Sequence, residues 1–125
     1  MIFKLILIFK PNKMIISSLL KDVEYSEVKP VIKVLMETDS SKEIRIVFKE
    51  GQKMREHKTA FPITVEMVAG ELNFGVNGKD LALTKGDLIA LEGNVTHDLH
   101  AKTNCIVRLT LDKSDDVNRV KKVVG

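Results

Sequence analysis

The sequence has few of the residues on which several classes of protein depend. It contains no tryptophan, one tyrosine and one cysteine among 125 residues. A single cysteine excludes an intrachain disulfide and predicts a reducing compartment, which we take to be the cytoplasm. Because Cys105 lies in an apolar run with Ile106 and Val107, we expect its thiol to be buried and inert.

Basic blocks and long apolar runs are also absent. The net charge of +3 comes from 20 basic and 17 acidic residues, which are mixed along the chain. Without an arginine-rich block or aromatic residues between basic ones, nucleic acid is not an expected partner. The apolar stretch at residues 1–9 is interrupted by Lys4 and is far shorter than the roughly 20 residues that span a bilayer. No small-residue cleavage site follows it, and we expect no membrane partner.

Residues 1–13 form an N-terminal extension in this interpretation, and residues 14–125 form the one domain that the length allows. Apolar side chains in residues 2–9 fall on both faces of an extended chain, as in a strand that is covered on both sides. We expect this segment to add an edge strand to a sheet, with a second subunit as one source of that sheet. The alternative is that the native chain starts at Met14.

Short strand-like runs, separated by turn residues, recur through the domain, which is typical of an all-β sandwich or barrel. The first five runs are residues 15–20, 31–36, 43–49, 52–57 and 63–69. The clearest hairpin has Leu72, Phe74 and Val76 alternating with small or polar residues before Asn77-Gly78. This dipeptide is typical of a type I′ turn.

One short helix is expected at the C-terminus. Ser114 is the candidate N-cap, and acidic residues follow it in the expected first turn. Val117, Val120 and Val124 form an apolar stripe at helical spacing. We expect this stripe to dock on the barrel or on a neighbouring subunit.

Glycines lie at set distances from two histidines. Gly51 precedes His57 by six residues, Gly70 follows His57 by thirteen, and Gly86 precedes His97 by eleven. Glycines in such positions mark turns that need positive φ. Two hairpins that each carry a histidine can bring two imidazoles together in a small barrel, so this region is a candidate metal or ligand pocket.

In this spacing the chain resembles the cupin superfamily, whose small barrels carry two glycine- and histidine-containing motifs. The first motif corresponds here to Gly51, His57, Thr59, Ile63 and Gly70, and the second to Gly86, Glu92, Asn94, His97 and Ala101. The resemblance implies a single double-stranded β-helix (jelly-roll) barrel with a short C-terminal helix. It leaves the function almost unconstrained, because one fold serves many functions.

The departures from the cupin motifs concern the metal. In metal-dependent cupins two motif-one histidines, a glutamate and a motif-two histidine hold the ion, but Thr59 and Ile63 replace two of these ligands here. Only His57 and His97 remain, fewer than the three or four protein ligands of usual zinc sites. The alternatives for a third ligand are Glu66, His100 and Glu92, of which the first two should face away by strand alternation. No cofactor is firmly predicted, and the alternative is Zn, Fe, Mn or Ni at low occupancy.

Two functional hypotheses remain. The first is a non-enzymatic small-molecule-binding or sensory module, with His57, Thr59 and His97 as ligand-binding residues and a weak or vestigial two-histidine metal site. The pocket wall would then be apolar, formed by residues such as Ile63, Leu88, Ala90, Val107 and Leu109. The second is a metal-dependent dioxygenase, isomerase or lyase that acts on a small organic substrate, with the metal on His57 and His97 and with catalytic residues unknown. In either case we expect a homodimer.

Overall fold

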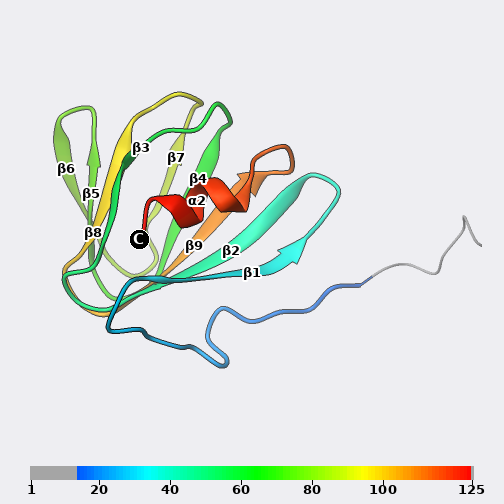
Figure 1. Ribbon diagram of the computed structural model, residues 1–125, viewed down its shortest axis with the longest axis horizontal. Helices are drawn as coiled ribbons and strands as arrows, with labels where there is room; N and C mark the ends of the chain where they lie inside the picture. The colour runs from blue at the N-terminus through cyan, green and yellow to red at the C-terminus, as the bar shows by residue number, and fades with distance from the viewer. Residues whose placement is uncertain (1–13, 125) are drawn as a thin grey trace, which may run out of the picture.

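A computed structural model describes residues 14–124 of the chain, and within this range it has nine strands and one helix (Figure 1). The N-terminal extension predicted at residues 1–13 lies outside the described residues. The strands are β1 (Val31–Glu37), β2 (Ser41–Phe48), β3 (Lys53–His57), β4 (Ile63–Ala69), β5 (Leu72–Val76), β6 (Lys79–Leu83), β7 (Leu88–Leu91), β8 (His97–Ala101) and β9 (Cys105–Asp112). The helix, α2, spans Val117–Lys122.

The strands form two antiparallel sheets that enclose the core. The five-stranded sheet has the order β1-β2-β9-β4-β7, and the four-stranded sheet has the order β3-β8-β5-β6. Most connections cross between the sheets, which gives the all-β jelly-roll barrel that the sequence predicts. The buried core draws side chains from both sheets, among them Phe48 and Phe74, which are both 0% exposed.

At the centre of the five-stranded sheet, side chains from three neighbouring strands meet on the inner face. In the register of β2, β9 and β4, Ile46 lies opposite Val107, which lies opposite Met67. All three side chains are at most 1% exposed. Because side chains alternate between the faces of a strand, the neighbouring residues Arg45 and Arg108 lie on the outer face. Both faces of β2 are buried, because Arg45 on its outer face is only 3% exposed.

Turns with positive φ appear where the glycine pattern predicts them. Asn77 and Gly78, between β5 and β6, have φ of 52° and 72°, the signs that a type I′ turn requires. Gly70 has a φ of 81°, and a Cβ at this position would lie 2.2 Å from the carbonyl oxygen of Asn104. A side chain at position 70 would therefore clash with the backbone as well as strain its own.

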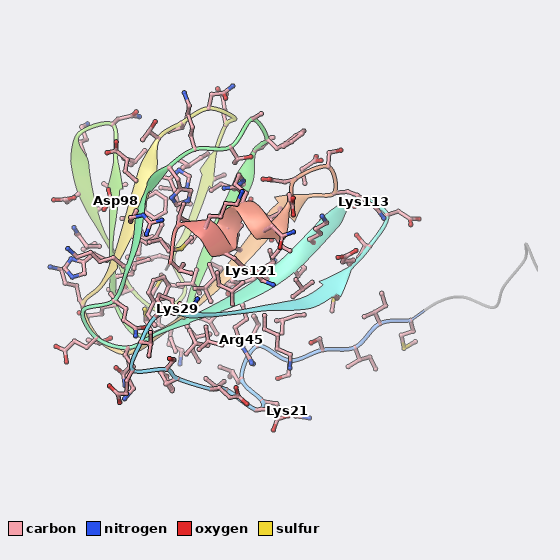
Figure 2. The ribbon with its side chains drawn as sticks, in the orientation of Figure 1. Lys21, Lys29, Arg45, Asp98, Lys113 and Lys121 are labelled. Atoms are coloured by element: carbon pink, nitrogen blue, oxygen red, sulfur yellow. The ribbon has the colours of Figure 1, made fainter. Side chains whose placement is uncertain are left out.

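The structure corrects the prediction of a strand at residues 15–20. This segment has no strand pairing, and Ile16 is 85% exposed. It is held on the outer face of the five-stranded sheet by Arg45, which donates hydrogen bonds to the carbonyl oxygens of Lys21 (2.8 Å) and Asp22 (3.2 Å) (Figure 2). The prediction of a strand is therefore wrong, because the segment contacts the sheet through the Arg45 side chain and not through backbone hydrogen bonds to a neighbouring strand.

Two other features bear on the sequence predictions. Cys105 is buried, and burial raises the pKa of its thiol to about 12, which confirms the expectation of an inert thiol. No helix within residues 14–124 has both the length and the apolar character needed to cross a bilayer.

Candidate functional site

A β-bulge in β3 determines the orientation of His57. In the pairing of β3 with β8, Met54 lies opposite Leu99 and His57 lies opposite His97. Three residue steps on β3 thus correspond to two on β8, so β3 contains one extra residue, as in a β-bulge. Met54 is 2% exposed and faces the core, and strict alternation would turn His57 to the outer face. The bulge instead brings the His57 side chain to the inner face.

His97 reaches the same place from a regular strand. Along β8, buried His97, Leu99 and Ala101 alternate with half-buried residues. The ring centroids of His57 and His97 are 4.3 Å apart with an interplanar angle of 61°, and the Phe74 ring stacks on His97 at 5.5 Å. The two imidazoles are therefore in direct contact, as the motif spacing predicts, and Phe74 supports one of them.

Hydrogen bonds to the backbone determine the tautomer of both rings. Nδ1 of His57 contacts the carbonyl oxygen of Arg55, and Nδ1 of His97 lies 2.8 Å from that of Val95. Because a carbonyl oxygen only accepts hydrogen bonds, each Nδ1 carries a proton and donates it. In a neutral ring this leaves Nε2 as an acceptor with a free electron pair.

Both rings are neutral at physiological pH. Burial lowers the pKa of His57 to about 4 from the ordinary value of 6.5, and it also lowers the pKa of His97. The positive charge of Arg119 lowers both pKa values further, by a smaller amount. The hydrogen bonds from Nδ1 to the backbone oppose these effects without outweighing them. The pair therefore offers two adjacent nitrogen acceptors and no charge.

Helix α2 closes the barrel above the two histidines. It lies across the opening between the sheets (Figure 1), and Val120 is 1% exposed. Val120 and Arg119 line the same interior cavity as His57 and His97. The other lining residues are apolar and come from both sheets: Ile46, Met54, Ile63, Val65, Leu99, Val107 and Leu109. The cavity measures about 10 Å³, roughly the space that one water needs. The barrel therefore does not enclose, in this state, the ligand-sized cavity that the binding hypothesis requires.

A buried carboxylate anchors α2. Asp115 accepts hydrogen bonds from Arg119 Nε and Nη2, both at 2.9 Å, and from Thr59 Oγ1 at 2.8 Å. Burial raises the pKa of Asp115, but the bonds from Arg119, from Thr59 and from the Asp116 N–H outweigh this effect and hold the pKa below its usual value. The Asp115 carboxylate thus links α2 to the loop between β3 and β4 through charge-assisted hydrogen bonds, which are stronger than bonds between neutral groups.

The N-cap of α2 differs from the sequence prediction. The cap is Asp116, whose side chain accepts from the N–H of Asn118 at 2.9 Å. Ser114 lies before the helix, where its own N–H donates to Asp112. The prediction of Ser114 as the N-cap is therefore wrong, although Asp and Ser are both favourable N-cap residues.

The residues present do not fit a tightly held metal ion. Two Nε2 atoms can coordinate a cation, but within residues 14–124 no group of three His, Cys, Asp or Glu side chains is placed to hold one ion. The alternatives for a third ligand lie elsewhere. Glu66 pairs with Arg108 on the outer face at 3.2 Å, His100 alternates away from the core, and Glu92 is exposed. Arg119 also places a positive charge on the same cavity, which opposes a divalent cation.

The structure brings together some of the predicted site residues and separates others. His57 and His97 line the cavity with the predicted wall residues Ile63, Val107 and Leu109. The Thr59 hydroxyl bonds to Asp115 instead of lining the cavity. Leu88 and Ala90 are wrong as wall residues, because both are exposed on β7 and its alternate residues, Ile89 and Leu91, pack on the core.

Sequence reasoning missed Arg119 and the closing role of Val120. Val120 was recognised as part of an apolar stripe, but the stripe did not show which surface it covers. Arg119 was not singled out by the sequence analysis. The available signal was the spacing of Asp115 and Arg119, because an acid and a base four residues apart lie on one side of a helix.

Comparison with solved structures identifies the fold. A RmlC-like cupin protein from Desulfovibrio desulfuricans is 21% identical, with a TM-score of 0.74, over 80% of this chain and 97% of its own. A RmlC-like cupin from Shewanella frigidimarina is 19% identical, with a TM-score of 0.72, over 86% of this chain and 96% of its own. KdgF from Halomonas sp. is 17% identical, with a TM-score of 0.62, over 70% of this chain and 81% of its own.

The chain therefore has the cupin fold, as its motifs predict. No protein-family model matches the sequence, and no curated protein matches it. At these identities the similarity establishes the architecture, and the chemistry must be argued from the residues of this chain.

Proposed function

We propose that the protein is a non-enzymatic module that binds a small molecule inside the barrel, next to His57 and His97. The observation that supports this best is the pair of neutral imidazoles, each with Nε2 as an acceptor, on one apolar cavity. Such an arrangement suits an uncharged ligand with an apolar body and hydroxyl or N–H donors. The proposed ligand-binding residues are His57 and His97, and Thr59 contributes through Asp115.

Binding requires α2 to move. A cavity of about 10 Å³ holds one water, whereas organic ligands need pockets of roughly 300 Å³ or more. Val120 lines this cavity at 1% exposure, and it belongs to the short helix α2. Ligand entry would therefore displace α2, and that displacement gives a sensory module its output.

Phenol is a suitable probe, because it joins an apolar ring to one hydroxyl donor. We expect phenol to raise the melting temperature of the wild-type protein and to shift the NMR signals of His57, His97 and α2. Val120→Ala enlarges the cavity and should strengthen the response, whereas His97→Phe should abolish it in both backgrounds. If phenol stabilises only Val120→Ala, the site can be occupied but stays closed in the wild type, and the proposal fails.

The enzyme hypothesis depends on a metal and is tested separately. A calorimetric titration with Zn²⁺ should give weak binding, because two neutral ligands next to a guanidinium do not neutralise a divalent charge. Tight 1:1 binding that His57→Ala and His97→Ala both abolish would instead favour the metal-dependent enzyme. Arg119→Gln is the matched variant, since removing the positive charge should strengthen Zn²⁺ binding without adding a ligand.

A further inference from the structure

Arg119 has hydrogen-bond donors that its anchoring role does not use. A guanidinium carries five N–H donors. Asp115 accepts one from Nε and one from Nη2, in the pair of parallel bonds that an arginine and a carboxylate favour. Within residues 14–124 no other group accepts a hydrogen bond from this guanidinium. Its remaining donors, on Nη1 and Nη2, are therefore available to a ligand.

These donors belong to a side chain that borders the interior cavity. Arg119 lines the cavity together with His57 and His97, and its side chain is only 26% exposed. Burial is the main cause of the lowered pKa values of both histidines, and the positive charge of Arg119 lowers them further. The cavity is thus bordered by two Nε2 acceptors, one on each imidazole, and by a guanidinium with unused donors.

The charges around the cavity favour an uncharged ligand. The Arg119 guanidinium is balanced by the Asp115 carboxylate, and both imidazoles are neutral at physiological pH. A carboxylate ligand would bring a negative charge that no further group in the site compensates, and an uncompensated buried charge is costly. The acceptor that suits Arg119 is therefore the oxygen of a neutral carbonyl group.

We propose that Arg119 is a specificity-determining residue and that the ligand carries a primary carboxamide on an apolar body. This inference rests on the proposed binding function and names the ligand class for the same site. The two N–H donors of a carboxamide match the two adjacent Nε2 acceptors, and its carbonyl oxygen accepts from Arg119. A hydroxyl has a single donor and would leave one buried Nε2 without a partner, which weakens binding.

Arg119 can keep its contact with the ligand while α2 moves. Its guanidinium is held by Asp115, which precedes the helix and accepts a hydrogen bond from the Thr59 hydroxyl at 2.8 Å. An arginine side chain has many rotamers, so the backbone near Val120 can shift outward without moving the guanidinium. The anchor therefore stays in place when the cavity opens.

Benzamide and aniline isolate the role of Arg119. Both join an apolar ring to an NH2 group with two donors, and only benzamide has the carbonyl oxygen. In NMR titrations of the full-length wild-type chain, we expect a dissociation constant about tenfold or more lower for benzamide, because hydrogen bonds to charged groups are strong. Arg119→Met keeps an unbranched side chain without donors, and it should make the two constants nearly equal.

Comparing the two probes separates recognition from helix anchoring, because both require the same opening of the cavity. Asp115→Asn is the matched control, since it weakens the anchor and retains the Arg119 donors, and it should keep the preference for benzamide. In the wild type, the side-chain ¹⁵N signals of Arg119 should shift with benzamide and not with aniline. This second measurement does not depend on any variant.

Equal binding of benzamide and aniline by the wild type, or a preference for benzamide that survives Arg119→Met, overturns the proposal. A preference that Asp115→Asn also abolishes would make Arg119 an anchor of the helix only, and would overturn it as well. Phenol distinguishes this result from a failure of the proposed function. If phenol binds and benzamide gains nothing over aniline, only the carboxamide assignment fails, whereas a wild type that binds none of the three probes contradicts both.

Discussion

The centre of the five-stranded sheet and the end formed by β3, β8 and α2 differ in the interactions that determine their structure. At the centre, β2 pairs with β9 in unbroken register, and Ile46, Val107 and Met67 meet on the inner face. At the β3 end, a bulge turns His57 inward, and an ion pair between half-buried Arg119 and buried Asp115 fixes the helix that closes the barrel. Regular pairing produces the core, whereas the irregular region brings together the polar groups that can bind a ligand.

The largest effect should come from the regular centre. Phe48→Ala removes a side chain that is 0% exposed, and we expect the free energy of unfolding to fall by about 3–5 kcal/mol. Urea denaturation followed by circular dichroism measures this change. Leu88→Ala, at a position on β7 that is 66% exposed, is the control and should change stability by less than about 0.5 kcal/mol. Similar losses in both variants would contradict the assignment of the two faces.

An intermediate effect should come from the anchor of α2. Asp115→Asn removes the charge that Arg119 binds, and we expect a loss of about 1–3 kcal/mol, because buried donors lose their charged partner. Asp116→Asn is the matched control on the next residue, since Asn caps a helix as well as Asp does. Urea denaturation of both variants measures the difference. An equal loss in the two would show that the helix depends on its cap and not on the ion pair.

A pH dependence of stability should also arise at the irregular end. In the unfolded chain His57 takes up a proton near the ordinary pKa of 6.5, but in the fold only near 4. Between these values the unfolded state binds more protons, so stability should fall as the pH drops from about 6.5 to about 4. We expect His57→Gln to weaken this dependence in urea midpoints measured across the range. An unchanged slope would mean that His57 is not buried as described.

The sequence was sufficient for the fold because the regular elements carry local signals. Asn77-Gly78 predicted its hairpin, the motif glycines predicted positive φ, and the paired motifs predicted that His57 and His97 meet. The first two signals depend on residues that are close together in the chain, and the third depends on the spacing of residues within each motif. The same reasoning failed at residues 15–20, where an apolar run lies on the sheet through contacts with Arg45 and not through strand pairing.

The candidate site was less predictable because its details depend on tertiary contacts. Alternation counted from Met54 places His57 on the wrong face, and only the register against β8 reveals the bulge. The ligand wall was misassigned at Leu88 and Ala90, because a four-residue apolar strand does not show which face is buried. The closure of the cavity by Val120 needed the position of α2, which no local pattern specifies.

The most direct test of this account is the protonation state of the two site histidines. Long-range ¹H–¹⁵N NMR correlations of the imidazole rings at pH 7 identify which nitrogen carries the proton, with His57→Gln and His97→Gln assigning the signals. We predict that both rings are neutral with the proton on Nδ1, which leaves two Nε2 acceptors on the cavity. A charged ring, or a proton on Nε2 of either histidine, would contradict the proposed binding site.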